Sequence, residues 1–217
     1  MYRSVIKRLI DLLGSLLLLV ILSPIMLIIF IALKVTGNGN PIFTQERAGR
    51  WEIPFRLFKF KTMIELTTST GQMASDELRL TTLGKFLRKT SLDELPQLIN
   101  VLIGQMSLIG PRPLFIKYLS SYRGKEVKRH DVRPGISGWA QVNGRNNATW
   151  DERLSLDVYY VENISFGFDL KILYKTIINI ILSKDVVVGN PYAMKDLNEE
   201  RAFDISSGVE IKETNKA

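Results

Sequence analysis

The sequence contains no cysteine and a single histidine, His130. Without cysteine the chain has no disulfide, no thiolate zinc site and no cysteine nucleophile. A single histidine excludes a metalloprotease of the H-E-x-x-H type, which needs two. The G-x-x-x-x-G-K-S/T phosphate loop, the G-x-G-x-x-G dinucleotide fingerprint and the G-x-S-x-G nucleophile elbow are absent as well. These absences exclude thiol chemistry and three common kinds of catalytic or nucleotide site.

Positive charge exceeds negative charge in this chain. Its 217 residues include 29 Lys and Arg against 22 Asp and Glu, a formal net charge of +7. Such an excess suits nucleic acid, an anionic membrane or a phosphorylated substrate. Because the basic residues are spread along the chain and the aromatic residues follow no RNA-binding pattern, we expect no nucleic-acid partner. With 46% hydrophobic residues, the chain is long enough for one domain with a buried core.

The longest uncharged stretch lies near the N-terminus, from Leu12 to Leu33. About 20 apolar residues suffice for a helix to cross a bilayer. A signal peptide would have a shorter apolar region followed by a cleavage site, and a core helix that is apolar on every face would need a large protein around it. We therefore expect residues 1–35 to form a membrane segment.

Two features of this segment argue against a simple span. Ser23 and Pro24 lie in its middle, where proline kinks or breaks a helix. Basic residues flank both ends, with Lys7 and Arg8 before the apolar run and Lys34 after it, and positive residues favour the cytoplasmic side. A re-entrant segment, helix–break–helix, that enters and leaves by the cytoplasmic face satisfies both ends. A kinked helix with one end outside is the alternative.

The rest of the chain divides into a catalytic region and a tail. A cluster of turn-forming residues over 36–41 ends the membrane segment, and we expect a cytosolic domain over residues 36–191. The tail, residues 192–217, is charged and has few large apolar side chains, so we expect it to be mobile. The patterns predict an α+β fold, mainly helical with a small sheet: a strand over 54–63 and helices over 76–89, 95–103, 115–126, 150–161 and 171–184. The last helix is amphipathic, so it lies either at the membrane interface or with its apolar face on the core.

Two adjacent acids, Asp93 and Glu94, are the most informative candidates for chemistry. Ser91 and Glu94 match a capping box, which would make them an ordinary helix start. Pro96 fits that interpretation poorly, because proline is favoured at the first position of a helix and disfavours helical angles in the residue before it. We therefore expect a helix that begins at Pro96, with both carboxylates just before it. There one carboxylate could hold Mg²⁺ while the other attacks a phosphorus atom.

Three longer stretches around these acids resemble the bacterial sugar transferase family, the monotopic phosphoglycosyl transferases. They are Thr90–Asn100, Met106–Pro113 and Arg133–Arg145, and Lys59–Met63 and Asp157–Tyr160 match as well. The resemblance covers nearly the whole chain. The chain lacks the additional N-terminal membrane helices of the larger family members, so we expect it to be a minimal catalytic core.

The resemblance implies a reaction and a mechanism. A sugar-1-phosphate moves from a UDP-sugar to a polyprenyl phosphate, such as undecaprenyl phosphate, and UMP is released. Asp93 attacks the phosphate that bears the sugar and forms an acyl phosphate, while Glu94 helps to bind Mg²⁺. The resemblance also implies a re-entrant helix with its break at Ser23 and Pro24, a place in the bacterial inner membrane and a catalytic domain on its cytoplasmic face. It leaves the sugar and homo-oligomerisation open.

Further binding residues follow from the same resemblance. Pro111, Arg112 and Pro113 match a loop that shapes the nucleotide and phosphate pocket. Physical alternatives exist for three other candidates: Lys59 suits a solvated strand face or membrane headgroups, Arg88 suits a helix C-terminus, and Asp157 suits an exposed helix position. The remaining substrate-binding candidates are Lys59, Arg88, Arg145 and Asp157.

Overall fold

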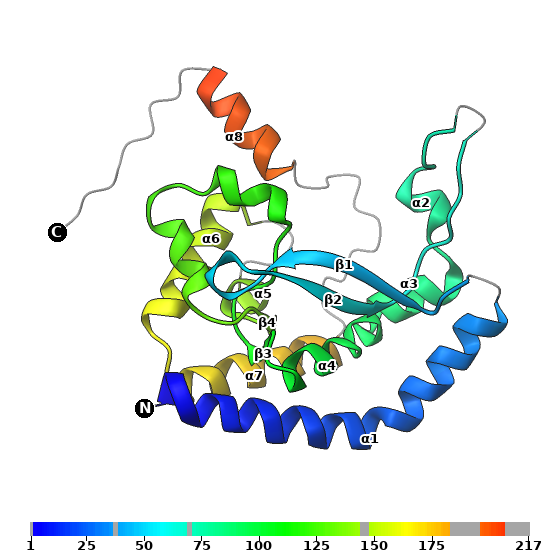
Figure 1. The fold of residues 1–217 in the computed structure, drawn as a ribbon, viewed down its shortest axis with the longest axis horizontal. Coiled ribbons are helices and arrows are strands. Elements are labelled where there is room, and N and C mark those ends of the chain that lie inside the picture. The colour runs from blue at the N-terminus through cyan, green and yellow to red at the C-terminus, as the bar shows by residue number, and fades with distance from the viewer. Residues whose placement is uncertain (1, 37–38, 69–70, 144–147, 183–195, 207–217) are drawn as a thin grey trace.

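The computed structural model of the chain describes residues 2–36, 39–68, 71–143, 148–182 and 196–206. Within these ranges the fold is mainly helical and has two small sheets, as predicted (Figure 1). Arg145, one of the predicted substrate-binding residues, lies outside the described residues.

The N-terminal segment forms a short π-helical turn, η1 (Tyr2–Ile6), followed by the long helix α1 (Lys7–Val35). The expected break at Ser23 and Pro24 is wrong: α1 is one helix that continues through Pro24 and curves along its length (Figure 1). Proline removes the N–H group that would bond the carbonyl four residues earlier, which belongs to Val20. The Ser23 hydroxyl donates to this carbonyl at 2.8 Å. The serine therefore replaces the missing donor, and the helix bends without leaving Val20 unpaired.

Both halves of α1 pack against the same domain. The first half is held by polar contacts: Arg8 donates to two carbonyls in the last turn of α4 (Gln97–Leu102), and Asp11 accepts hydrogen bonds from Ser107 and the Leu108 N–H. The second half is held by apolar contacts, in a cluster of Ile29, Leu33, Phe60 and Leu87. By length and composition the helix could cross a membrane, yet only 11% of its most apolar window is buried in the protein. It is therefore not a core helix.

The first sheet is an antiparallel hairpin of β1 (Ile42–Ala48) and β2 (Pro54–Phe60), connected through the turn η2 (Arg50–Glu52). The predicted strand over 54–63 is β2, which ends at Phe60. The second sheet is a parallel pair of short strands, β3 (Ser107–Ile109) and β4 (Gly135–Ser137). A Cβ atom on Gly135 would lie 2.0 Å from the Gly110 nitrogen, so this pairing requires glycine.

The single helix predicted over residues 76–89 is wrong. The structure has two helices there, α2 (Asp76–Arg79) and α3 (Thr82–Lys89). Leu80 and Thr81 are extended between them, and the Thr81 side chain caps α3 by accepting the Gly84 N–H. A Cβ atom on Gly84 would lie 2.0 Å from the Thr62 carbonyl oxygen, so the glycine lets α3 pack directly on the chain that follows β2.

The remaining elements are helices and 3₁₀ turns. The predicted helix over 115–126 consists instead of 3₁₀ turns, and the helices predicted over 95–103, 150–161 and 171–184 correspond to α4, α6 and α7. In chain order the structure has η3 (Leu92–Glu94), α4 (Gln97–Leu102), η4 (Ile116–Ser121), η5 (Gly124–Asp131), α5 (Trp139–Asn143), α6 (Trp150–Glu162), α7 (Phe166–Ile181) and α8 (Leu197–Ser206).

Part of the tail, expected to be mobile, is docked as helix α8. Leu197 is fully buried in a cluster with Trp150 and Leu154. Asn198 accepts a hydrogen bond from the Ser121 hydroxyl, and Asp196 forms an ion pair with Lys117. One leucine, Leu197, supplies the main apolar contact of α8. The charged composition of the tail therefore did not predict this helix.

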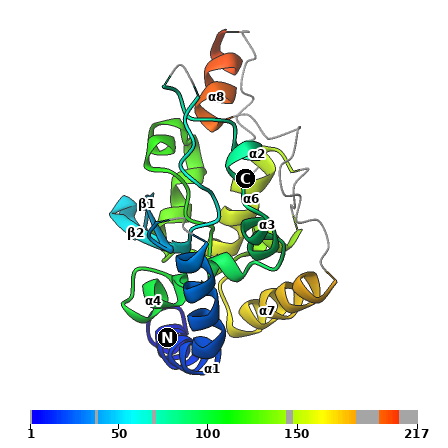
Figure 2. The same cartoon turned by 90° about the vertical axis from the view of Figure 1, so that its right-hand side faces the viewer.

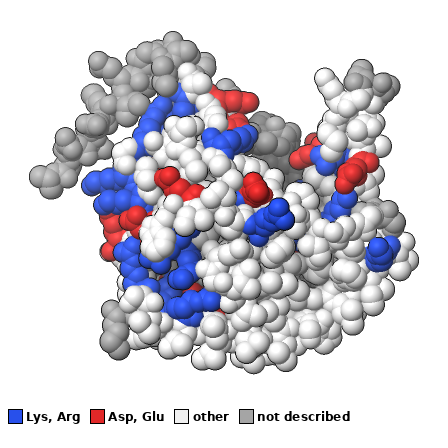
Figure 3. All heavy atoms as spheres, viewed as in Figure 1, with Lys and Arg blue, Asp and Glu red and all other residues white. Residues whose placement is uncertain are grey.

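The N-terminal ends of α1 and α7 meet, where Lys7 donates to Asp169, and both helices lie on the lower side of the molecule (Figures 1 and 2). On α7, Ile172 is fully buried, whereas Leu173, Ile177 and Ile180 on other faces are about half exposed. The alternative of core packing is confirmed for the face of Ile172, and the exposed apolar residues on the other faces leave the membrane-interface alternative a prediction. The surface over most of α1 is uncharged (Figure 3).

Candidate active site

Asp93 and Glu94 lie in the turn η3, directly before α4, as predicted. Ser91 makes no side-chain capping bond, so the capping-box alternative is wrong. Ser91 instead has a left-handed backbone, with φ of 57°. A non-glycine residue pays about 1–2 kcal/mol for this conformation. The strain lies two residues before Asp93 and turns the chain so that both carboxylates follow the end of α3.

Two basic residues from different parts of the chain meet at Glu94. Lys59 of β2 donates to Glu94 Oε1 at 2.6 Å, and Arg112 of the loop after β3 donates to the same oxygen at 2.7 Å. Lys59 Nζ also lies 3.9 Å from Asp93 Oδ2. The structure thus brings four of the predicted site residues together.

The two neighbouring carboxyl groups have opposite pKa shifts. Burial alone would raise the pKa of Glu94, but the charges and hydrogen bonds of Arg112 and Lys59 outweigh it and lower that pKa to about 2. Burial raises the pKa of Asp93, and the charge of Glu94 adds to the rise, while Lys59, Arg112 and Arg88 oppose it. Glu94 is therefore a fixed anion, whereas Asp93 is a more basic carboxylate with no ion pair closer than 3.9 Å.

Arg88 is near the pair but bound elsewhere. It lies in the last turn of α3, where its Nε donates to the Thr62 hydroxyl at 3.0 Å. Its charge lowers the pKa of Asp93. The position of Arg88 in the last turn of α3 confirms the helix C-terminus alternative, and its contact with phosphate stays a prediction.

One buried amide that the sequence analysis missed sets the position of Lys59. The Asn100 side chain of α4 accepts the Phe58 N–H at 3.1 Å and donates to the Arg56 carbonyl at 2.7 Å. Asn100 is fully buried. It joins α4 to β2 one residue before Lys59, so the lysine and the carboxylates keep a fixed distance.

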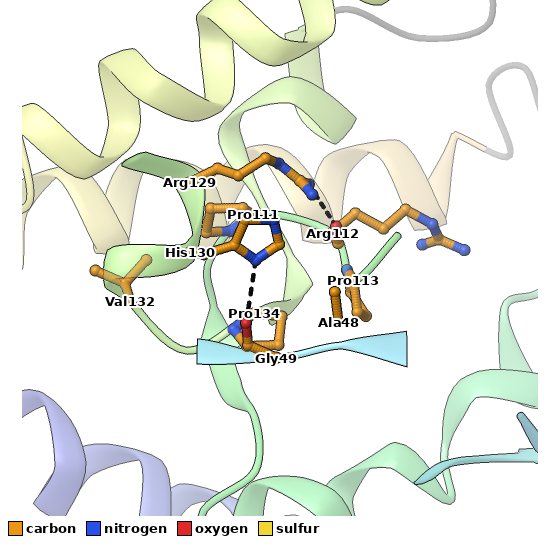
Figure 4. A pocket seen from close by; sticks show the side chains of 9 residues that line it. All are labelled: Ala48, Gly49, Pro111, Arg112, Pro113, Arg129, His130, Val132 and Pro134. Atoms are coloured by element: carbon orange, nitrogen blue, oxygen red, sulfur yellow. Dashed lines mark hydrogen bonds between the residues drawn. The ribbon is translucent and has the colours of Figure 1, made fainter. Parts of the chain in front are cut away.

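Asp157 lies behind the Pro111–Pro113 loop, not beside the carboxylate pair. It is buried and forms an ion pair with Arg129, with Nη2 and Oδ2 2.8 Å apart. The same Arg129 nitrogen donates to the Arg112 carbonyl at 2.7 Å, and Nη1 donates to the Tyr122 hydroxyl. In Figure 4 the Arg112 side chain points away from Arg129. Asp157 therefore supports the backbone of the loop that carries Arg112.

His130 lies behind the same loop. Its Nδ1 donates to the Gly49 carbonyl at 3.1 Å, and it lines a small cavity together with Pro111 and Pro113 (Figure 4). Burial, followed by the charge of Arg129, lowers the pKa of His130 to about 4. The histidine is neutral at physiological pH, and its hydrogen bond joins η5 to Gly49, the residue after β1.

The carboxylates of the site fit a substrate-dependent Mg²⁺ site better than a complete protein cage. Among the described residues, no three or more His, Cys, Asp or Glu side chains gather as a metal cluster. Mg²⁺ is commonly held by one or two carboxylates together with substrate phosphates and water. Both hydrogen bonds to Glu94 go to Oε1, so Oε2 has no protein partner among the described side chains.

The family model described as bacterial sugar transferase matches residues 2–183. The chain belongs to the bacterial sugar transferase family. Its carboxylate pair, Lys59 and the Arg112 loop are all inside the matched region.

Three named relatives illustrate the range of the family. The chain is 48% identical to the uncharacterized sugar transferase EpsL of Bacillus subtilis, over 84% of this chain and 90% of EpsL. It is 41% identical to the UDP-glucose:undecaprenyl-phosphate glucose-1-phosphate transferase of Klebsiella pneumoniae, over 83% of this chain and 41% of that protein. A UDP-N-acetylgalactosamine-undecaprenyl-phosphate N-acetylgalactosaminephosphotransferase of Aeromonas hydrophila is 40% identical, over 81% of this chain and 44% of its own length. The chain thus spans less than half of the relatives whose names state a reaction.

Proposed function

We propose that this sugar transferase moves a sugar-1-phosphate from a UDP-sugar to a polyprenyl phosphate and releases UMP, as the first membrane step of assembling a surface glycan or a glycoprotein glycan. The observation that carries the proposal is the pair of the buried Asp93 and the partly buried Glu94, with Lys59 and Arg112 on Glu94. Transfer between two anions needs cations that neutralise phosphate charge and a nucleophile that is separate from them. The relatives of stated activity use UDP-sugars with different sugars, so the sugar itself stays open.

In the first half-reaction, Asp93 Oδ attacks the phosphorus that bears the sugar. A bond forms between the carboxylate oxygen and phosphorus, the bond from phosphorus to the bridging oxygen breaks, and UMP leaves with that electron pair. Lys59 near Oδ2 favours the ionised carboxylate. In the second half-reaction, an oxygen of the polyprenyl phosphate attacks the same phosphorus and restores Asp93. The covalent step divides one difficult transfer into two easier ones.

Glu94 is the residue that would hold Mg²⁺, through Oε2 and together with the donor phosphates. A bound Mg²⁺ would neutralise charge on the diphosphate. Lys59 and Arg112 fix the Glu94 carboxylate from its other oxygen and stay available to phosphate oxygens.

We also propose that α1 is re-entrant and that the domain lies on the cytoplasmic face of the bacterial inner membrane. Both halves of α1 contact the same domain, the first through Arg8 and Asp11 and the second through Ile29 and Leu33. A helix that crosses a bilayer straight holds its ends about 30 Å apart on opposite sides. Cysteine labels at Arg3 and Asn38 should both react from the cytoplasm, and labelling of either from the periplasm would contradict the proposal.

Intact mass spectrometry tests the chemistry directly. The purified protein is incubated with Mg²⁺ and a panel of UDP-sugars without lipid acceptor, beside Asp93→Asn. We expect an adduct of one phosphosugar on the native protein and none on the variant, which also names the donor. Equal UMP release by both proteins after addition of polyprenyl phosphate would remove Asp93 from the mechanism. In a parallel assay Glu94→Gln should change the Mg²⁺ dependence of UMP release, and an unchanged dependence would contradict its role as ligand.

A further inference from the structure

Arg47 lies on the same face of the hairpin as Lys59. In the register of the hairpin, Phe43 is opposite Lys59 and Arg47 is opposite Phe55. Residues opposite each other share a face, and alternate residues of a strand do so too. Arg47 is thus four residues along β1 from the position beside Lys59, roughly 13 Å away.

The guanidinium of Arg47 is held in place but has unused hydrogen-bond donors. It stacks on Phe115, with Cζ 3.6 Å from the ring centroid, and Nη2 donates to Gln45 Oε1 at 2.7 Å. Nε is buried and has no partner in the described part of the chain, and no described carboxylate forms an ion pair with Arg47. A guanidinium has five N–H donors, so most of them remain available.

Its position is fixed relative to the loop that carries Arg112. Phe115 follows Pro113 by two residues, and the N–H of Ala48, next to Arg47, donates to the Leu114 carbonyl at 3.1 Å. Strand β1 and the loop are therefore joined at this point, and Arg47 lies beside the chain that carries Arg112 to Glu94.

The electrostatics of Arg47 indicate an excess of positive charge. Burial, followed by the charge of Arg112, lowers the pKa of Arg47 to about 10, against the smaller opposite effects of Tyr118 and Glu94. At neutral pH both arginines are charged. Two neighbouring guanidinium groups with unused donors match the oxygens of a phosphate group, which would relieve their repulsion.

We propose that Arg47 binds the nucleotide phosphate of the sugar donor, the one that leaves as part of UMP. This inference rests on the proposed function. With the phosphate that bears the sugar at Asp93, beside Lys59, the second phosphate of the donor lies toward the loop of Arg112, against which Arg47 is held by Phe115. The lipid phosphate needs no contact with Arg47.

Calorimetric titration of UMP into the protein in neutral detergent tests this assignment, because it needs neither catalysis nor a sugar. Arg47→Gln should raise the Kd for UMP about tenfold or more, since hydrogen bonds to charged groups are among the strong ones. Arg47→Lys keeps the charge but loses the planar set of guanidinium donors, so its Kd for UMP should lie between those of the native protein and Arg47→Gln. Arg56→Gln is the matched control: Arg56 is an exposed arginine of the same hairpin, opposite Glu46 and thus on the other face. It should leave the Kd unchanged.

Two further readouts separate ligand binding from a structural role. Arg47→Gln should keep or raise the Tm of the ligand-free protein, because it removes a buried like charge; a lower Tm would make the stacking on Phe115 structural and overturn the proposal. Formation of the phosphosugar adduct should need more UDP-sugar, whereas transfer from the preformed adduct to polyprenyl phosphate should keep its rate. A loss confined to that second step would assign Arg47 to the lipid phosphate and overturn the proposal.

UMP binding distinguishes a failure of the proposed function from a failure of the proposed role of Arg47. If the native protein binds no UMP, the uridine nucleotide donor is wrong, and the role of Arg47 falls with it. If the native protein and Arg47→Gln bind UMP equally, the role of Arg47 alone is wrong.

Discussion

The two sides of the Pro111–Pro113 loop carry similar ion pairs with different surroundings. On the front, Arg112 reaches Glu94 with a side chain that is 45% exposed. On the back, Arg129 and Asp157 bind each other with side chains only 2% and 6% exposed. A partly exposed pair can exchange its partner for a phosphate, whereas a buried pair cannot open without leaving a charge unpaired in the interior. The front is suited to chemistry, and the back holds the front in position.

The largest expected effect comes from replacing a carboxylate on the front of the loop by an amide. Asp93→Asn should lower turnover about 10⁴-fold or more, because it removes the proposed nucleophile. Its stability should be unchanged or higher, since burial raises the pKa of Asp93 and the amide is neutral. UMP release and urea unfolding measure the two effects, and a large loss of stability would mean that the front is structural as well.

The same chemical change on the back should act in the opposite way. Asp157→Asn should lower the free energy of unfolding by about 3–5 kcal/mol, because it leaves Arg129 buried without its counter-charge. Unfolding in urea, followed by tryptophan fluorescence, measures the loss. Asp151→Asn is the control: it removes an exposed partner of Arg201 and should cost less than about 1 kcal/mol. Equal effects of the two variants would contradict the distinction between front and back.

His130 should make the back of the loop sensitive to acid. Its pKa is about 4 when folded, below its unfolded value of 6.5, so the unfolded state takes up the proton first as the pH falls. This contribution to stability is constant above pH 6.5 and is lost between pH 6.5 and 4, in total about 3 kcal/mol. The difference in free energy of unfolding between the native protein and His130→Gln should change across this window. A constant difference would mean that His130 is not buried as a neutral group.

The smallest expected effect comes from replacing the guanidinium group of Arg112 on the front of the loop. Arg112→Lys keeps the positive charge but loses the planar pair of donors, so kcat/KM should fall about tenfold. Stability should change by less than about 1 kcal/mol because the side chain is half exposed. Steady-state kinetics and thermal unfolding check both values. A loss of stability as large as that of Asp157→Asn would remove the difference between the two sides.

The front of the site could be predicted from the sequence more readily than the back. Asp93 and Glu94 are adjacent, and Pro96 predicts the start of the helix that follows them. Arg129 and Asp157 are 28 residues apart, and no periodic pattern connects them. The same is true of Asn100 and the β2 backbone that it holds, 42 and 44 residues away. Tertiary contacts of this kind have no local signal.

The secondary structure predicted from local patterns is wrong at two places where tertiary packing or a side-chain hydrogen bond decides the backbone. The apolar spacing over 76–89 suits one helix, but the approach of Gly84 to the Thr62 carbonyl requires a second helix start at Thr81. The break expected in α1 followed from the helix-breaking effect of Pro24 and from the family resemblance at Ser23 and Pro24. The Ser23 hydroxyl, which bonds the Val20 carbonyl, is the reason that the helix continues.

The contacts of the first turn of the chain also concern the order of synthesis. Tyr2 and Lys7 both donate to Asp169, 167 and 162 residues later. A ribosome adds about 5–20 residues per second, so roughly 8–30 seconds separate the two ends of this contact. During that interval the apolar helix exists without the carboxylate that holds it. The nascent chain must therefore deliver α1 to lipid or to a chaperone before the domain can fold around it.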